Sequence, residues 1–233
     1  MAKRVLITGS AKRIGGHLAL ALAKAGWDVV VHYRHSEEEA LSLAERIEQL
    51  GRKAQLIQGD LADSANLTSI IDQAGPITAL INNASIFEDI EWDEVGIDDW
   101  NRHVAVNLSA PFFLSQRFAQ TLSGEGRIIN FLDWRATRPG KDHLPYTITK
   151  SALAAVTKSL AQSLAPRITV NAIAFGAILK PSDGGDTSNV LDHVPSHRWA
   201  DLDEVTESVR FLLEGPSYIT GEIIHLDGGR HLV

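Results

Sequence analysis

Short apolar runs rich in β-branched residues alternate with helix-like segments, and this rhythm constrains the fold of the chain more than any other feature. A strand–helix–strand alternation predicts a parallel sheet that is buried between helices on both of its faces. The 233 residues show no linker, shift in composition or internal repeat, so we expect one α/β domain spanning residues 1–233. The predicted strands are Val5–Thr8, Asp28–Tyr33, Ala54–Gln58, Ala79–Asn82, Arg127–Phe131, Ile168–Ile173 and Ile223–Leu226, and the predicted helices are Ile14–Ala25, Glu37–Leu50, Leu67–Gln73 and Tyr146–Leu164.

Local signals mark the ends of two of these helices. Gly26 and Gly51 stand where glycines commonly end a helix in the left-handed conformation. Ser36, with Glu39 three residues later, predicts a capping box at the start of the second helix.

Two stretches have no regular pattern and read as loops. Phe87–Gly96 follows the fourth predicted strand, and Gly176–Ala200 carries two prolines and three glycines after the sixth. Both follow strands at the carboxyl edge of a parallel sheet, where open α/β folds bind ligands. We expect the longer loop, residues 176–200, to act as a lid over a substrate site.

Composition excludes several classes of function. Hydrophobic residues make up 44% and charged residues 22%, which does not fit a disordered or fibrous chain. The formal charge of −7 gives no basic excess to attract nucleic acid or anionic lipid, so we expect neither partner. The chain has no Cys, which excludes disulfides and Cys-based metal sites. No apolar run is long enough for a signal segment or a membrane span, so we expect a soluble cytoplasmic protein.

One pair of histidines has a spacing that metal sites use. His193 and His197 are four residues apart, but Pro195 stands between them and opposes a helix there. We therefore expect no metal site.

The first predicted strand is followed by a turn with three glycines, Thr8–Gly16. Glycines here let the backbone approach a phosphate, and the amides at the start of the next helix can bind its charge. A tight turn without a ligand would look the same, but this turn opens the first strand–helix–strand unit, where a dinucleotide fold would begin.

Basic residues follow the second predicted strand, at the place where an acidic residue usually binds the ribose of NAD. Arg34, together with Arg13 from the first turn, can bracket a 2′-phosphate through charge-assisted hydrogen bonds. This pattern favours NADPH over NADH, unless both arginines are only solvated surface charges.

Tyr146 and Lys150 are four residues apart and therefore lie on one face of a predicted helix. A nearby ammonium favours the phenolate, so the pattern predicts a lowered pKa for Tyr146 and a role in proton transfer. Two further residues are not informative when each is taken alone. Asn107 can be an amide that packs a helix, and Asp133, at the end of a predicted strand, can be a surface carboxylate.

Together these motifs resemble the short-chain dehydrogenase/reductase family over nearly the whole chain. The resemblance implies a Rossmann-like, doubly wound parallel sheet of about seven strands and hydride transfer with a nicotinamide cofactor. The motifs that carry it, in order and spacing, are the Thr8-Gly9 turn, Asp60-Leu61, Asn82-Asn83-Ala84, Asn107, Tyr146 with Lys150, Asn171 and Asp227-Gly228-Gly229.

Departures from the usual pattern point to one branch of that family. Asp133 replaces the common catalytic serine, Arg13 replaces a glycine of the first turn, and Ser85 ends the Asn-Asn-Ala motif. These changes resemble the pteridine reductases, and the segments Asp133–Lys150 and Leu226–Leu232 resemble the bacterial dihydromonapterin reductases. Phe175-Gly176 departs from the family's Pro-Gly, which leaves the shape of the lid entrance undefined.

The resemblance implies a set of site residues and a substrate. The expected reaction is NADPH-dependent reduction of a dihydropterin, 7,8-dihydromonapterin above all, with dihydrobiopterin and dihydrofolate as further substrates, in a homotetramer. The expected catalytic residues are Asn107, Asp133, Tyr146 and Lys150, and the expected substrate contacts are Ser85, Phe87, Asp133 and Tyr146. The expected cofactor contacts are Gly9, Arg13, Ile14, Tyr33, Arg34, His35, Ser36, Asp60, Leu61, Asn83, Ala84, Ser85, Tyr146 and Lys150.

Other interpretations stay open at this point. A reductase of a ketone could carry Asp133 in place of serine, and a nucleotide-binding regulatory protein would need no proton donor at Tyr146. Trp134 and Trp199 can line a substrate pocket or pack in an interface. Arg230 and His231 can reach a neighbouring subunit or belong to a frayed tail.

Overall fold

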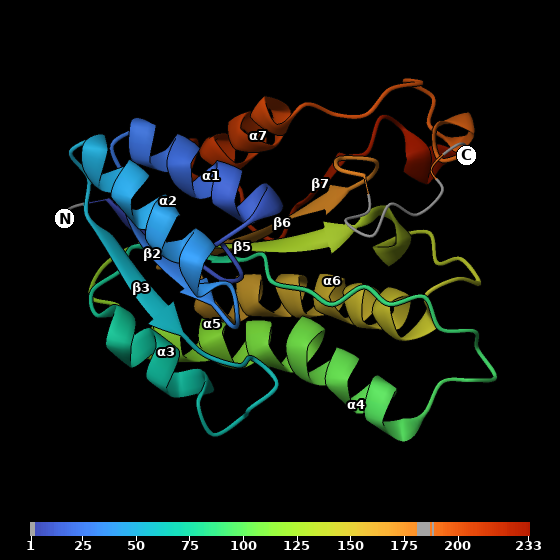
Figure 1. Ribbon diagram of the computed structural model, residues 1–233, viewed down its shortest axis with the longest axis horizontal. Coiled ribbons are helices and arrows are strands. Elements are labelled where there is room, and N and C mark those ends of the chain that lie inside the picture. Colours follow the sequence, from blue (N-terminus) through green and yellow to red (C-terminus); the bar gives the residue numbers. More distant parts are fainter. Residues whose placement is uncertain (1–2, 181–186, 188) are drawn as a thin grey trace.

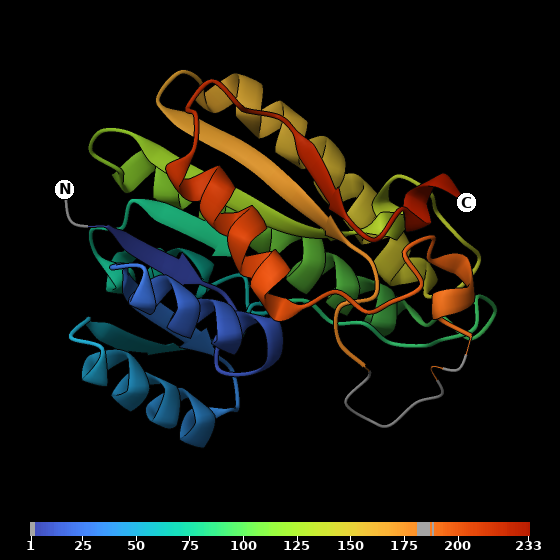
Figure 2. The same ribbon diagram turned by 90° about the horizontal axis from the view of Figure 1, so that it is seen from above.

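A computed structural model describes residues 3–180, 187 and 189–233 of the chain. In the described residues, one sheet of parallel strands has the order β3-β2-β1-β4-β5-β6-β7 (Figures 1 and 2). This confirms the predicted Rossmann-like α/β fold. The strands are β1 (Arg4–Ile7), β2 (Asp28–Tyr33), β3 (Ala54–Gln58), β4 (Ala79–Asn82), β5 (Gly126–Asp133), β6 (Ile168–Phe175) and β7 (Ile223–Leu226).

Helices cover both faces of the sheet (Figure 1). On one face lie α1 (Arg13–Lys24), α2 (Glu37–Gln49) and α7 (Leu202–Glu214); on the other lie α3 (Leu67–Ala74), α4 (Ile97–Val104), α5 (Ala110–Thr121) and α6 (Leu144–Leu164). A π-helical segment, η1 (Ala105–Ser109), joins α4 to α5. Short 3₁₀ turns are η2 (Trp134–Ala136), η3 (Leu191–His193) and η4 (Arg230–Leu232).

The core consists of two main apolar layers, one on each face of the sheet. Successive strand residues point to opposite faces, so Val29 and Val31 pack with α1, α2 and α7 while Val30 packs with the α3 and α5 side. Strands buried on both faces read as continuous apolar runs, which is the pattern of the sequence.

The strand order reverses between β1 and β4, because β2 lies on one side of β1 and β4 on the other. Loops leaving the carboxyl ends of these strands diverge, and the crevice between them is where doubly wound sheets bind dinucleotides. The fold thus places the Gly9 turn and the Asn83 segment side by side.

Some local predictions hold and one is wrong. Gly26 and Gly51 have φ of +93° and +73° and end α1 and α2 as expected. The capping box at Ser36 does not form, because its side chain makes no cap hydrogen bond and the Glu39 carboxylate instead pairs with Lys12 at 2.6 Å.

The irregular stretches are confirmed as loops in the part of the chain that the structure describes. Phe87–Gly96 is irregular, and among the described residues of the longer loop only η3 is helical. The centre of that loop, residues 181–186 and 188, lies outside the described residues, so the lid stays a prediction. None of the helices in the described ranges is long and apolar enough to cross a membrane.

Candidate active site

The first turn and the end of β4 are joined by hydrogen bonds. The Thr8 hydroxyl accepts from the backbone N–H groups of Asn83 and Ala84, each at 3.0 Å, and Asn83 Nδ2 donates to the Thr8 carbonyl at 2.6 Å. Gly9 has φ of +61°, and a Cβ there would lie 3.0 Å from the Ala84 Cβ. A Cβ on Gly15 would lie 2.7 Å from Asn83 Nδ2. The two backbones therefore approach more closely than side chains at the glycines would allow.

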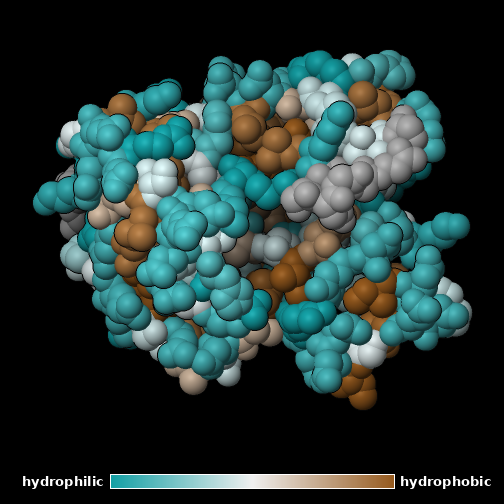
Figure 3. Space-filling view, viewed as in Figure 1, coloured by the Kyte–Doolittle hydropathy of each residue, from teal (hydrophilic) through white to brown (hydrophobic). Residues whose placement is uncertain are grey.

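A pocket of about 430 Å³ opens between these two segments. Figure 3 shows this face of the molecule hollowed near its centre, with apolar side chains inside and hydrophilic residues around the rim. The structure thus brings together most of the predicted cofactor contacts: Gly9, Arg13, Ile14, Tyr33, Arg34, His35, Ser36, Asn83, Ala84 and Ser85 all line the pocket.

Four of the predicted cofactor contacts do not line this pocket: Asp60, Leu61, Tyr146 and Lys150. Asp60 holds Arg34 from the side, with its carboxylate 2.9 Å from Arg34 Nε. Leu61 is buried in the core beside α3. Lys12, which the sequence analysis left without a role, does line the pocket.

Arg13 and Arg34 both reach the pocket from opposite segments, as predicted. Arg13 has φ of +54°, and its guanidinium donates to the carbonyl of Lys180 at 3.1 Å. About half of the Arg34 side chain is exposed. A guanidinium from each segment is therefore available to an anionic group between them.

His32 supports the first turn from beneath, a role that the sequence analysis missed. Its ring is 2% exposed, and Nδ1 accepts the Gly9 N–H at 3.1 Å. Burial lowers the pKa of His32 from 6.5 to about 4. The ring is therefore neutral at physiological pH, as an acceptor of this hydrogen bond must be.

Tyr146, Asp133 and Lys150 meet at the carboxyl end of β5. The Tyr146 hydroxyl donates to Asp133 Oδ2 at 3.3 Å. Lys150, one helical turn after Tyr146, donates to the Phe131 carbonyl at 2.8 Å, and its Nζ lies 5.5 Å from the Tyr146 ring centroid. All three are largely buried, so their charges interact strongly.

The predicted lowering of the Tyr146 pKa is wrong. Burial of the hydroxyl raises the pKa of Tyr146 well above 10, and the Asp133 carboxylate beside it raises it further. Burial also lowers the pKa of Lys150 to about 8, so its amine is still mostly protonated at neutral pH. Tyr146 is accordingly a phenol that carries a proton to donate at neutral pH.

Arg135 holds the Asp133 carboxylate, a role that the sequence analysis did not assign. Its backbone N–H and its Nη1 both donate to Asp133 Oδ1, at 2.9 and 3.3 Å, and the guanidinium also pairs with Asp142. Asp133 is therefore not a surface carboxylate but an oriented acceptor with one oxygen toward Tyr146.

Asn107 is fully buried in the π-helical segment η1. Its Oδ1 accepts from Ser85 Oγ and the Ile86 N–H, and its Nδ2 donates to the Ile86 carbonyl and to Thr149 Oγ1, at 2.9–3.3 Å. One amide thus ties the segment after β4 to the helix that carries Tyr146.

Phe87 covers the reaction centre from the loop after β4. Its ring lies edge-on to Tyr146 at 4.7 Å and is 52% exposed. The ring also stacks with His143 at 4.0 Å, and the Arg135 guanidinium lies 5.8 Å from its centroid. A half-exposed aromatic ring beside a buried phenol can take a flat ring by stacking.

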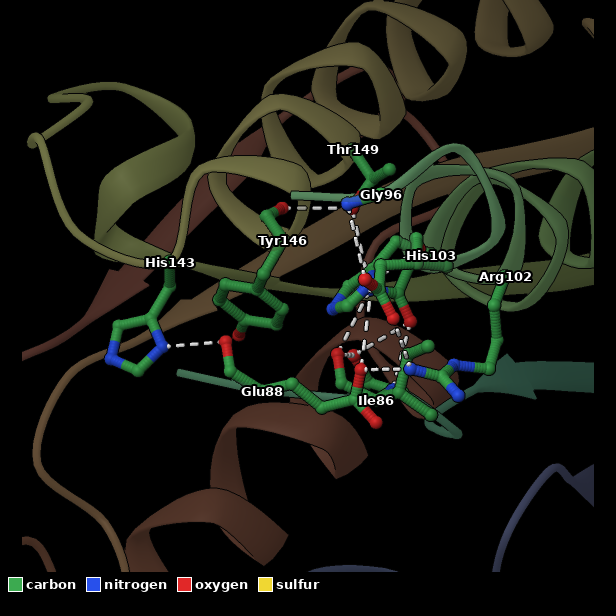
Figure 4. A network of polar contacts seen from close by, with 11 residues as sticks. Ile86, Glu88, Gly96, Arg102, His103, His143, Tyr146 and Thr149 are labelled. Atoms are coloured by element: carbon green, nitrogen blue, oxygen red, sulfur yellow. Dashed lines mark hydrogen bonds and ion pairs between the residues drawn. The ribbon is translucent and has the colours of Figure 1, made fainter. Parts of the chain in front are cut away.

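His143, which the sequence analysis did not single out, fixes this loop (Figure 4). Its Nδ1 donates to the Glu88 carbonyl at 2.9 Å, and its φ of +50° starts the helix of Tyr146. The Glu88 carboxylate pairs with Arg102 of α4 at 2.6 Å, which ties the loop to a second helix.

The C-terminal residues fold back onto the chain. Arg230 lies 4.4 Å from the Trp134 ring, and His231 Nδ1 lies 2.7 Å from Asp227 Oδ2. The tail is therefore ordered against residues of its own chain rather than frayed.

Comparisons with known proteins extend over nearly the whole chain. The family described as enoyl-(acyl carrier protein) reductase matches residues 9–231. The 3-oxoacyl-[acyl-carrier-protein] reductase FabG of Staphylococcus aureus (strain Mu50 / ATCC 700699) is 32% identical over 100% of this chain and 99% of its own.

Solved structures agree with the fold. The FolM alternative dihydrofolate reductase 1 from Brucella canis, complexed with NADP, aligns with a TM-score of 0.93 and 36% identity over 99% of this chain and 94% of that one. A short-chain dehydrogenase from Burkholderia cenocepacia J2315, in complex with NADP, aligns with a TM-score of 0.92 and 33% identity over 99% and 98%.

Proposed function

Because the chain belongs to the short-chain dehydrogenase/reductase family, we propose that it reduces a dihydropterin with NADPH. The preferred substrate is 7,8-dihydromonapterin, and dihydrobiopterin and dihydrofolate are further substrates. The observation that carries the proposal is the contact of Tyr146 with Asp133 beside the half-exposed ring of Phe87. The similarity to a FolM alternative dihydrofolate reductase supports a pterin substrate.

The pocket fits NADPH. The glycines of the first turn leave room that a Cβ would fill, as a diphosphate against the backbone requires. Arg13 and Arg34 lie where they can bind a 2′-phosphate, and Lys150 can hold the ribose hydroxyls. Bound NADPH would supply the hydride, which the C6 carbon of the substrate's C=N bond would accept.

A carboxylate at residue 133 favours the reduction of a C=N bond over the reduction of a ketone. Reduction of a ketone develops negative charge on oxygen, which a neighbouring carboxylate would destabilise. Reduction of a C=N bond proceeds through protonated nitrogen, whose positive charge Asp133 would stabilise. Tyr146 would give its proton to N5, while Asp133 orients the phenol through their hydrogen bond.

Phe87 and Asn107 complete the site in positioning roles. The pterin ring would stack on the half-exposed ring of Phe87, whose contacts to His143 and Tyr146 set its angle. Asn107 would hold Ser85 and the Tyr146 helix at a fixed separation.

The test is NADPH oxidation with 7,8-dihydromonapterin, dihydrobiopterin and dihydrofolate side by side, repeated with NADH for the best substrate. Turnover of a dihydropterin with NADPH preferred is the expected result. Binding of NADPH without turnover of any dihydropterin would overturn the substrate assignment.

A reductase of a non-pterin ketone is the second candidate. The 32% identity to a 3-oxoacyl-[acyl-carrier-protein] reductase favours it. Turnover of a ketone such as a 3-oxoacyl thioester, without turnover of dihydropterins, would establish it. A regulatory protein that only binds the nucleotide would consume neither substrate.

A further inference from the structure

The C-terminal segment forms a rigid turn that presents one arginine. The Asp227 carboxylate is buried and accepts from the backbone N–H groups of Gly229 and His231, at 2.9 and 2.8 Å. Gly228 and Gly229 have φ of +63° and +87°, a conformation that other residues rarely adopt. Arg230 therefore projects from a turn that is fixed on both sides.

Arg230 lies at the end of a column of side chains that starts at the reaction centre. The Arg135 guanidinium is 5.8 Å from the Phe87 ring centroid and 4.7 Å from that of Trp134. The Arg230 guanidinium is 4.4 Å from the same Trp134 ring. Trp134 directly follows Asp133, so this column leads from the reacting groups to the C-terminal turn.

The two arginines of the column differ in their charge partners. Arg135 pairs with both Asp133 and Asp142. Arg230 makes none of the ion pairs found among the described residues, and its Nε is buried without a hydrogen-bond partner there. Burial and the nearby Arg135 lower the pKa of Arg230, while the carboxylates of Asp133, Asp142 and Asp227 oppose that shift from a distance. An anion at Arg230 would satisfy a donor that is otherwise costly to bury.

We propose that Arg230 is a substrate-binding residue that recognises a carboxylate on the side chain of the dihydropterin, beside Trp134. This proposal rests on the function proposed above and adds a specificity to it. A guanidinium that makes no ion pair among the described residues can hold one planar carboxylate in a two-point contact. A phosphate, with nearly two charges, would face repulsion from Asp133 and Asp142 across the same cluster. The site would accordingly take carboxylate-bearing dihydropterins as well as those with neutral hydroxyalkyl side chains.

The variant Arg230→Gln tests the proposal, with Arg210→Gln as the matched control. Arg210 lies on α7 in an exposed pair with Glu214 and has no contact with the column. In Arg230→Gln, KM should rise roughly 10- to 100-fold for dihydrofolate, which carries carboxylates, the loss expected for a charge-assisted hydrogen bond. KM for 7,8-dihydromonapterin, which is neutral, should change less than about threefold, because neutral contacts are left intact. Arg210→Gln should match the wild type with both substrates.

Two results would overturn the proposal. One is an equal loss for both substrates, which would mean that Arg230 only supports Trp134. The other is an unchanged KM for dihydrofolate.

Equilibrium binding separates this proposal from the proposed function. Calorimetry with NADP⁺ present would compare folic acid with 6-hydroxymethylpterin, without any need for turnover. Tighter binding of folic acid that Arg230→Gln abolishes would support the carboxylate site even if no dihydropterin is reduced. Equal affinity of the wild type for the two ligands would refute the site even if dihydropterins are reduced.

Discussion

Because burial keeps His32 neutral in the folded chain, the free energy of unfolding depends on pH. The folded chain protonates His32 only near pH 4, whereas an unfolded chain takes up the proton near 6.5. Between these values the unfolded state binds more protons, so the free energy of unfolding decreases as the pH falls. From pH 7 to pH 5 the loss from this one ring amounts to about 2 kcal/mol.

Urea unfolding at pH 7 and pH 5 measures this effect when the wild type is compared with His32→Asn. Asparagine does not titrate in this range, and its side-chain oxygen can still accept the Gly9 N–H. The wild type should lose about 2 kcal/mol more than the variant between the two pH values. The control His35→Asn replaces an exposed ring nearby and should follow the wild type. An equal pH dependence in the wild type and His32→Asn would refute the argument that burial keeps His32 neutral.

Further predictions concern the cofactor, the proton donor and the assembly. Arg13→Ala and Arg34→Ala should each weaken NADPH binding roughly 10- to 100-fold and NADH binding far less; equal losses in fluorescence titrations with both cofactors would remove these arginines from 2′-phosphate recognition. Tyr146→Phe should lower kcat by about 10²- to 10⁴-fold at unchanged NADPH affinity, and a fully active variant would show that another group donates the proton. Asp133→Asn should lower the Tyr146 pKa, since it removes the carboxylate that opposes the phenolate; the basic limb of the pH–rate profile would move to lower pH, and an unmoved limb would contradict this. Sedimentation equilibrium should give a homotetramer of the 25.4 kDa chain, and a monomer would contradict it.

The sequence predicts the sheet well because its strands are buried on both faces and are therefore continuous apolar runs. Helices α4, α5 and α7 are absent from the prediction. For α4 and α5 the sequence lacks a clear signal, whereas for α7 a readable signal was overlooked. The π-helical segment Ala105–Ser109 changes the helical repeat between α4 and α5, so no single period runs through both. In α7 the signal was present, since Val205, Val209 and Leu212 follow the helical spacing and Asp201 begins a capping box.

Most residues of the cofactor pocket were predictable because they follow strands closely, and the strand order decides which loops meet. The supports of the site were not predictable in the same way. His32 is one residue in an apolar strand, and only its burial beneath Gly9 gives it a role. His143 acts through contacts with Phe87 and Glu88 of a distant loop, and Arg135 acts on Asp133, which lies two residues before it.

The acid strength of Tyr146 depends on such contacts more than on its neighbour in sequence. The helical spacing places Lys150 close to Tyr146, but its amine donates to the Phe131 carbonyl and not to the phenol. The Asp133 carboxylate is nearer to the hydroxyl and opposes its ionisation, while Arg135 partly offsets that effect. The Asp133–Arg135 pair therefore decides how firmly the phenol keeps its proton. Because its pKa is raised, the Tyr146 phenol carries its proton at neutral pH, which is the state that the proposed protonation of a substrate nitrogen would use.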